Sequence, residues 1–216
     1  MKAILIPVKE FRRSKERLAP HFSKDERSSL AEALCEDMFQ MVAQAKGAVR
    51  VYVVSREEKA LGLARKYSWE TIAETEQISE SHSVDAASRI CAEGGITALL
   101  RLPIDIPLAT ASDIEALWTA LEPAPCAVLV PSRDGAGTNA LLRAPPTLFP
   151  SHFGPNSFAL HLEAAERCGA RTKIVRSPQI ALDVDEPADL AALRSELKAD
   201  CATARWLKQH ARKIKG

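Results

Sequence analysis

The stretch AILIPVKEFRRSKERL, residues 3–18, joins a short apolar run to a strongly basic segment. The run stops at Lys9, is too short for the apolar region of a signal peptide and lacks a small-residue cleavage site, so it predicts a buried first strand. In an open α/β sheet, the carboxyl end of such a strand is where phosphorylated ligands bind. Lysines and arginines there can hold a triphosphate, although a solvated basic loop is the alternative. The cations that follow the run are Lys9, Arg12, Arg13, Lys15 and Arg17.

The composition is that of an ordinary globular protein. The chain has 216 residues, 46% of them hydrophobic and 26% charged, which is enough for one sizeable core. Its net charge of +1 creates no global field that would attract nucleic acid or an anionic membrane. No apolar stretch approaches the roughly 20 residues that span a bilayer. We therefore expect no nucleic-acid partner and no membrane partner.

The cysteines lie far apart and form no CxxC pair, at positions 35, 91, 126, 168 and 201. This spacing argues against a zinc site and against a disulfide framework. It favours small apolar core residues in a reducing compartment. We expect a cytoplasmic protein and assign no catalytic role to a cysteine.

Strand-like and helical patterns alternate along nearly the whole chain. After residues 3–8, apolar or β-branched runs predict strands at 49–55, 71–73, 98–102, 127–131, 140–143, 173–176 and 180–184. Helical patterns lie at 24–46, 58–67, 83–93, 112–121, 157–168 and 187–197. Ser83 or Asp85 is a plausible cap of the helix at 83–93, and Pro187 starts the helix at 187–197.

This alternation predicts an α/β fold in which helices cover both faces of a mostly parallel sheet. With no internal repeat or low-complexity linker, residues 1–197 form a single three-layer α/β/α domain. We expect residues 198–216 to be a basic C-terminal tail, which could form a surface helix with a frayed end.

Two acidic segments follow predicted strands and could hold a divalent cation. Asp105 comes directly after residues 98–102, between two prolines, and magnesium prefers carboxylates together with substrate phosphates. Strand alternation in 180–184 would place Asp183 and Asp185 on one face, where their mutual repulsion attracts a cation. The alternatives are local backbone contacts for Asp105 and a helix cap for Asp185.

Two loops are suited to anions. The glycine turn at residues 135–139 allows close approach of a ligand to backbone amides. The loop at 153–157 leads into a predicted helix, where Ser157 could donate a hydroxyl or serve as a cap. His161 lies one helical turn later and could face the same pocket, although such a histidine is more often structural.

The order of these pieces resembles the guanylyltransferases of coenzyme F420 biosynthesis, which act on 2-phospholactate or phosphoenolpyruvate. The resemblance extends from residue 6 to residue 190. It rests on IPVK at 6–9 with SKERL at 14–18, DIPL at 105–108, RDGAGTNALL at 133–142, FGPNS at 153–157 and LDVDEPADL at 182–190. It implies a Rossmann-like nucleotidyltransferase fold of the nucleotide-diphospho-sugar-transferase type.

The resemblance also implies a reaction. GMP would pass from GTP to phosphoenolpyruvate, 2-phospho-L-lactate or 3-phospho-D-glycerate, with Mg²⁺ as cofactor and release of pyrophosphate. The residues that match the family's catalytic phosphate contacts are Lys9, Lys15 and Arg17. The nucleotide site would comprise these three together with Pro7 and Asp85. Magnesium would be held by Asp105, Asp183 and Asp185, and the acceptor acid by Thr138, Gly154 and Ser157.

Two departures from the family pattern bear on specificity. Val84-Asp85-Ala86 stands where the family usually has Leu-Asn-Ala, in a region that normally lies beside the nucleotide. The glycine turn has Ala136 in place of a threonine. These changes are compatible with a changed acceptor or with a shifted nucleotide preference.

Three other functions stay open at this point. The chain could transfer a nucleotide from CTP or GTP to a sugar phosphate or a molybdopterin, bind GTP without catalysis, or act as a plain interaction protein. A mixed anhydride product is labile, so we hypothesise direct hand-off to the next transferase of the pathway. The family leans toward dimers, but no stripe in the sequence indicates a homodimer.

Overall fold

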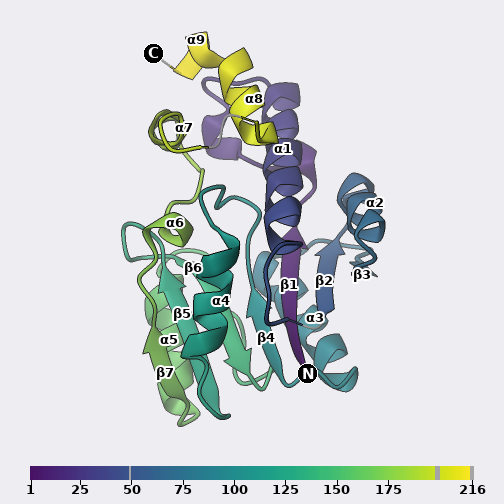
Figure 1. The fold of residues 1–216 in the computed structure, drawn as a ribbon, viewed down its shortest axis with the longest axis vertical. Helices are drawn as coiled ribbons and strands as arrows, with labels where there is room; N and C mark the ends of the chain where they lie inside the picture. The colour runs from purple at the N-terminus through teal and green to yellow at the C-terminus, as the bar shows by residue number, and fades with distance from the viewer. Residues whose placement is uncertain (49, 198–199, 215–216) are drawn as a thin grey trace.

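The computed structural model describes residues 1–48, 50–197 and 200–214, and its middle layer is a sheet of order β3-β2-β1-β4-β6-β5-β7 (Figure 1). Val49, the first residue of the second predicted strand, lies outside the described residues. In chain order the strands are β1 (Lys2–Val8), β2 (Arg50–Ser55), β3 (Glu70–Ala73), β4 (Ala98–Arg101), β5 (Cys126–Pro131), β6 (Thr138–Ala144) and β7 (Arg171–Ile174).

The sheet is mostly parallel, as predicted. β1 pairs in parallel with β2 and β4, β2 with β3, and β5 with β7, whereas β6 runs antiparallel to β4 and β5. After β3 the chain crosses back and places β4 on the other side of β1. The order therefore reverses at β1, and the crevice beyond the carboxyl ends of strands at such a point is a common ligand site.

Helices cover both faces of the sheet (Figure 1). Because side chains alternate along a strand, Ile4 and Ile6 of β1 pack with α1 (Lys24–Val42), α2 (Glu58–Lys66) and α4 (Ala111–Ala120). Ala3 and Leu5 point the other way, onto α3 (Glu80–Glu93). On that same side, α5 (Ser157–Arg167) packs against β5 and β6. The three-layer α/β/α arrangement is thus confirmed.

Capping side chains set the starts of two helices. Ser23 and Glu26 form a reciprocal capping box at the start of α1. α3 begins three residues earlier than predicted, because Ser79 accepts a hydrogen bond from the backbone N–H of His82. The prediction that Ser83 or Asp85 caps this helix was therefore wrong. α1 ends at Val42, short of the predicted residue 46.

The predicted strand at residues 180–184 was also wrong. Ser177 caps a short helix, α6 (Pro178–Ala181), and an irregular segment then leads into α7 (Pro187–Leu193). The apolar residues of this stretch are buried separately, with Ile180 in the main core and Val184 in a cluster with α7 and α8. Buried and partly exposed residues alternate along 180–184 although no strand pairs with this segment, and this alternation produced the false strand pattern. Asp185 is not the cap, since Glu186 occupies the N-cap position of α7.

The last described residues pack against α1. They form α8 (Ala202–Gln209) and α9 (Ala211–Ile214). The Asp37 carboxylate accepts hydrogen bonds from the backbone N–H groups of Ala202 and Thr203, each at 2.7 Å. The Trp206 indole packs on Phe22 with ring centroids 5.2 Å apart. Residues 198–199 and 215–216 of the predicted tail lie outside the described residues.

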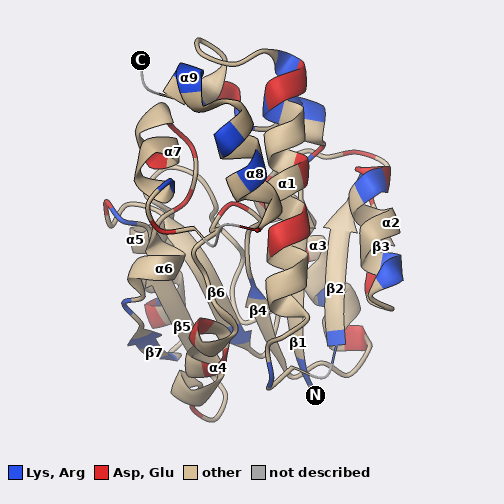
Figure 2. Ribbon diagram, turned by 45° about the horizontal axis from the view of Figure 1, so that its top comes forward, with Lys and Arg blue, Asp and Glu red and all other residues tan. Residues whose placement is uncertain are grey.

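Charged residues of both signs are interspersed over the helices (Figure 2). Two short 3-10 turns, η1 (Phe11–Arg13) and η2 (Glu16–Leu18), shape the basic loop after β1. Among the described residues, no helix has both the length and the apolar character that a membrane span requires.

Candidate active site

A cleft of about 1010 Å³ opens beyond the carboxyl ends of β1 and β4. Its walls come from the basic loop, the start of α3, the segment after β4, the glycine turn, the loop before α5 and the segment before α7. The predicted site residues that line it are Pro7, Lys9, Lys15, Arg17, Asp105, Thr138, Gly154, Ser157, Asp183 and Asp185. Lys15 and Asp185, which are 170 residues apart in the sequence, therefore meet in one cleft.

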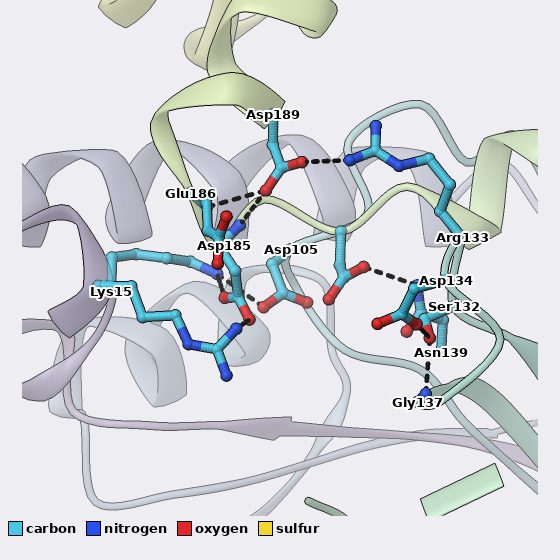
Figure 3. Close-up of polar contacts among 12 residues, drawn as sticks. Lys15, Asp105, Ser132, Arg133, Asp134, Gly137, Asn139, Asp185, Glu186 and Asp189 are labelled. Atoms are coloured by element: carbon cyan, nitrogen blue, oxygen red, sulfur yellow. Dashed lines mark hydrogen bonds and ion pairs between the residues drawn. The ribbon is translucent and has the colours of Figure 1, made fainter. Parts of the chain in front are cut away.

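Lys15 lies between two carboxylates (Figure 3). Its Nζ is 2.7 Å from Asp105 Oδ2 and 3.4 Å from Asp185 Oδ1, and its side chain is only 5% exposed. Arg17, which is well exposed, reaches the other oxygen of Asp185 at 3.3 Å. Lys15 also has a left-handed backbone, with φ of 56°, which costs a non-glycine residue about 1–2 kcal/mol. Strain of this kind is typical of functional sites.

The charges of this cluster shift one another's pKa values. Burial alone would lower the pKa of Lys15, but Asp105 and Asp185 outweigh it and the pKa is raised. Burial would raise the pKa of Asp105, but the charge and the hydrogen bond of Lys15, together with the charge of Arg101, outweigh it and the pKa is lowered. Lys15 is therefore a fixed cation and Asp105 a fixed anion at neutral pH.

Asp183 is the carboxylate of the cluster with the least compensation. The Asn139 side-chain amide donates to its Oδ1 at 3.2 Å. Burial first, and then the charge of Asp105, raises the pKa of Asp183. Within residues 1–48, 50–197 and 200–214, however, no group of three or more His, Cys, Asp or Glu side chains forms a ready-made metal cage.

Asp189 holds the segment that carries Asp183 and Asp185. Its Oδ2 accepts the backbone N–H groups of Asp185 and Glu186 at 3.0 and 2.8 Å, and Arg133 pairs with its Oδ1 at 2.8 Å (Figure 3). These contacts of Asp189 hold Asp183 and Asp185 at the cleft. The segment reaches the cleft through turns and not through the strand alternation that we predicted. Sequence reasoning missed Asp189, although the pair of acidic residues at positions 186 and 189 is the spacing of a helix capping box.

The glycine turn uses its amides internally. Gly137 donates to Ser132 Oγ at 2.7 Å (Figure 3). Ala136 donates to Asp134 Oδ1 at 2.9 Å, and Gly135 donates to the Ser132 carbonyl oxygen at 2.9 Å. The expectation that these amides receive an anion is therefore not met. Glycine is needed at position 137 because a Cβ there would lie 2.9 Å from Ser132 Oγ. The turn presents the next residue, Thr138, to the cleft.

Thr138 is oriented by a neutral histidine. His161 Nε2 accepts the backbone N–H of His152 at 2.9 Å, so in the neutral ring the proton lies on Nδ1. Nδ1 is 3.0 Å from Thr138 Oγ1, which therefore accepts this bond. Burial, with the charge of Arg143, lowers the pKa of His161 to about 3 and keeps the ring neutral. The Thr138 hydroxyl proton is left to donate to a ligand, and Ser157 Oγ lies 3.4 Å away.

The family profile described as "Guanylyl transferase CofC like" matches residues 1–210. The chain belongs to this family. A phosphoenolpyruvate guanylyltransferase from Rubrobacter xylanophilus is 37% identical over 191 residues, which are 88% of this chain and 92% of the relative. A 3-phospho-D-glycerate guanylyltransferase from Colwellia psychrerythraea is 29% identical over 208 residues, covering 93% and 98% of the two chains.

Solved structures place this family member in the nucleotidyltransferase fold. A protein from Desulfovibrio desulfuricans, assigned to the nucleotide-diphospho-sugar transferases, superposes with a TM-score of 0.79 at 16% identity. The match covers 99% of this chain and 96% of that structure. The predicted fold class, a Rossmann-like sheet of the nucleotide-diphospho-sugar-transferase type, is therefore confirmed.

In this guanylyl transferase family member, the structure places Asp85, a predicted site residue, outside the cleft. Its carboxylate accepts the Ser151 backbone N–H at 3.0 and 3.1 Å and lies 3.6 Å from the buried Arg143 guanidinium. The described residues that line the cleft do not include it. α3 turns Asp85 toward the chain that follows β6, where its carboxylate supports the loop before α5.

Three successive backbone amides tether that loop. Ser151 donates to Asp85, His152 to His161, and Phe153 to Ser81 Oγ at 2.8 Å. Arg143, which sequence reasoning missed, joins the same support by donating to Ser88 Oγ at 3.0 Å and to the Phe149 carbonyl oxygen. An arginine inside a predicted buried strand was the available signal, since buried charges are almost always paired.

Proposed function

We propose that this chain transfers GMP from GTP to a small phosphorylated three-carbon acid and releases pyrophosphate, the guanylyl transfer of coenzyme F420 biosynthesis. One observation carries the proposal: a single cleft joins the Lys15–Asp105–Asp185 charge cluster to the donor pair Thr138 and Ser157. Relatives that act on phosphoenolpyruvate and on 3-phospho-D-glycerate support this class of acceptor. 2-Phospho-L-lactate is the third candidate.

The reaction itself needs little covalent help. An oxygen of the acceptor's phosphate attacks the α-phosphorus of GTP, the bond from that phosphorus to the bridging oxygen breaks, and pyrophosphate leaves with the electron pair. A phosphate monoester is already a nucleophile at neutral pH, so no general base is needed. Two polyanions must instead be brought together, and positioning with charge neutralisation supplies most of the rate.

The basic loop supplies the cations for this task. Lys15 is held in place by its carboxylate partners. Lys9 and Arg17 are exposed, so Lys9 can turn toward a triphosphate and Arg17 can exchange its contact with Asp185 for one. We assign these three residues to the phosphates of GTP, with Pro7 beside them in the wall of the cleft. Their charge would stabilise the negative charge that develops on the leaving pyrophosphate.

Mg²⁺ fits the acidic side of the cleft. Asp105, Asp183 and Asp185 offer hard oxygen ligands, and the position of the Lys15 ammonium between two of them supports the binding of a cation beside these carboxylates. The raised pKa of Asp183 indicates a carboxylate in need of positive charge. The described residues form no complete set of protein ligands for a metal. Magnesium commonly binds through one or two carboxylates and takes further ligands from substrate phosphates. When bound, the ion neutralises phosphate charge.

The acceptor would bind at the opposite wall. Thr138 has a hydroxyl proton to donate, Ser157 lies beside it, and Gly154 completes the loop before α5. Neutral donors in a buried pocket suit a carboxylate or phosphate oxygen, because each hydrogen bond to a charged group is worth about 1.5–3 kcal/mol.

The test is a pyrophosphate-release assay with GTP and Mg²⁺. Phosphoenolpyruvate, 2-phospho-L-lactate and 3-phospho-D-glycerate are offered separately, with CTP and ATP as nucleotide controls. We expect release with GTP and at least one of the three acids. Release only with CTP or ATP, or GTP binding without release with any of the acids, would overturn the proposal.

A further inference from the structure

Arg101 is a buried cation in the acceptor half of the cleft. It is the last residue of β4 and lines the cleft although its side chain is only 6% exposed. Strand alternation turns it to the same side as Leu99, toward α3. One guanidinium nitrogen, Nη1, donates to the carbonyl oxygens of Thr138 and Asn139 at 3.4 and 3.3 Å. Arg101 therefore touches the strand end that presents the Thr138 hydroxyl.

Two further contacts tie Arg101 to the loop before α5 and to the start of α3. The Phe153 ring from the loop before α5 stacks on the guanidinium, whose carbon is 4.1 Å from the ring centroid. The other terminal nitrogen, Nη2, pairs with the carboxylate of Glu80 at the start of α3. Glu80 is 40% exposed at its side chain and lines the same cleft. Its carboxylate therefore covers the guanidinium from the cleft side.

The hydrogen bonding of Arg101 is incomplete. Its Nε is buried and has no hydrogen-bond partner in the part of the chain that the structure describes. A buried guanidinium N–H without an acceptor costs free energy. The planar fork of arginine is suited to grip a carboxylate with two parallel hydrogen bonds. The site thus holds both a free donor and a partner carboxylate that can leave toward solvent.

The acceptor has two anionic groups, and among the described residues Arg101 is the cation that hydrogen-bonds to Thr138 in the wall assigned to the acceptor. The phosphate must face GTP and the basic loop, so the carboxylate needs a positive charge of its own. Resting on the proposed function, we propose that Arg101 recognises the acceptor's carboxylate and that Glu80 occupies the guanidinium until the acceptor displaces it. Glu80 then acts as an internal competitor that lowers the apparent affinity for the acid.

The decisive variant is Glu80→Gln, which keeps the shape of the side chain and removes its charge. Because a competitor reduces apparent affinity by the fraction of sites it occupies, we expect the KM for the active acid to fall about fivefold. The KM for GTP should stay unchanged. An unchanged or higher KM for the acid would overturn the proposal.

The second variant, Arg101→Met, is tested with a pair of acceptors. One is the active acid and the other is its analogue with CH₂OH in place of the carboxylate (glycerol 3-phosphate for 3-phospho-D-glycerate). We expect kcat/KM to fall about 100-fold for the acid, as for other buried charged partners. For the analogue, kcat/KM should stay within about threefold of the wild-type value. Equal losses with both acceptors would show that Arg101 is only structural.

The matched controls are Glu163→Gln and Arg167→Met. These residues form an exposed ion pair within α5, one turn apart, and neither lines the cleft among the described residues. Neither control should change the KM for the acid. Neither should change the ratio of kcat/KM for the acid to kcat/KM for the analogue.

Thermal shift provides a readout that is independent of catalysis. Ligand that binds only the folded protein raises the Tm, so the acid should stabilise Glu80→Gln more than wild type, and the CH₂OH analogue should not. If wild type releases no pyrophosphate with any acid, the proposed function fails. The rise in Tm with the acid, compared with the rise in Tm with its CH₂OH analogue, still decides whether Arg101 binds a carboxylate.

Discussion

At the end of the cleft beside the basic loop, Lys15 is held between two carboxylates, whereas at the end beside α5, Thr138 is held by a neutral histidine. The first end is an open network of charges whose partners can exchange for phosphates or a cation. The second is a buried network of hydrogen bonds whose members keep their positions through His161 and the loop that Asp85 supports. The difference suggests that one end neutralises charge during the reaction, while the other orients a substrate.

The largest effect is expected at the charged end, from Asp105→Asn. The amide keeps the shape of the side chain but removes the anion that pairs with Lys15. We expect kcat to fall by about 10³-fold, the scale at which single electrostatic groups act in catalysis, with little change of the fold. Pyrophosphate release and Tm are measured beside Asp25→Asn, an exposed pair with Arg12. Near-normal rates would remove Asp105 from the reaction site.

Asp183→Asn separates activity from stability at the same end. The raised pKa of Asp183 means that ionising it disfavours the folded state, a penalty absent below the unfolded pKa and full above the folded pKa. We expect activity to fall about 100-fold. The Tm at pH 7 should rise by about 2 °C, since partial exposure limits the gain.

A scan of Tm against pH checks the sign. The advantage of Asp183→Asn over wild type should vanish as the pH falls below the ordinary pKa of 3.8. A variant that is less stable than wild type at pH 7 would contradict the assignment of Asp183 as an uncompensated carboxylate.

Ser157→Ala examines the hydrogen-bonded end. Loss of one hydroxyl should raise the KM for the acceptor about tenfold, which corresponds to one hydrogen bond of about 1.4 kcal/mol. The KM for GTP should change far less. Steady-state kinetics with each substrate varied in turn makes the distinction, and a parallel loss for both substrates would make Ser157 a structural residue.

Asp85→Asn gives the smallest expected change. An asparagine oxygen can still accept the Ser151 N–H, but the charge partner of Arg143 is lost. We expect about a threefold rise in the KM for the acceptor, because the loop keeps its hydrogen bond to position 85, and no change in the KM for GTP. A change confined to the KM for GTP would restore the sequence-based assignment of Asp85 to the nucleotide.

Much of the fold followed from local patterns. The apolar runs of β1 and β5 are buried over most of their length, and α1 begins at Lys24, the predicted residue. Periodicity works there because each element repeats one environment. It failed at residues 180–184, where single apolar residues enter two different clusters.

The sequence by itself determined the alternation of strands and helices, the basic loop after β1 and the order of the motifs that mark the family. Those features depend on neighbours within a few residues. Only the tertiary structure decided that Lys15 lies between Asp105 and Asp185, that Asp85 supports a loop, and that Arg101 meets Glu80 and Phe153. These contacts join residues 21 to 170 positions apart. Long-range pairing of charges depends on how the layers pack, and local sequence patterns do not encode it.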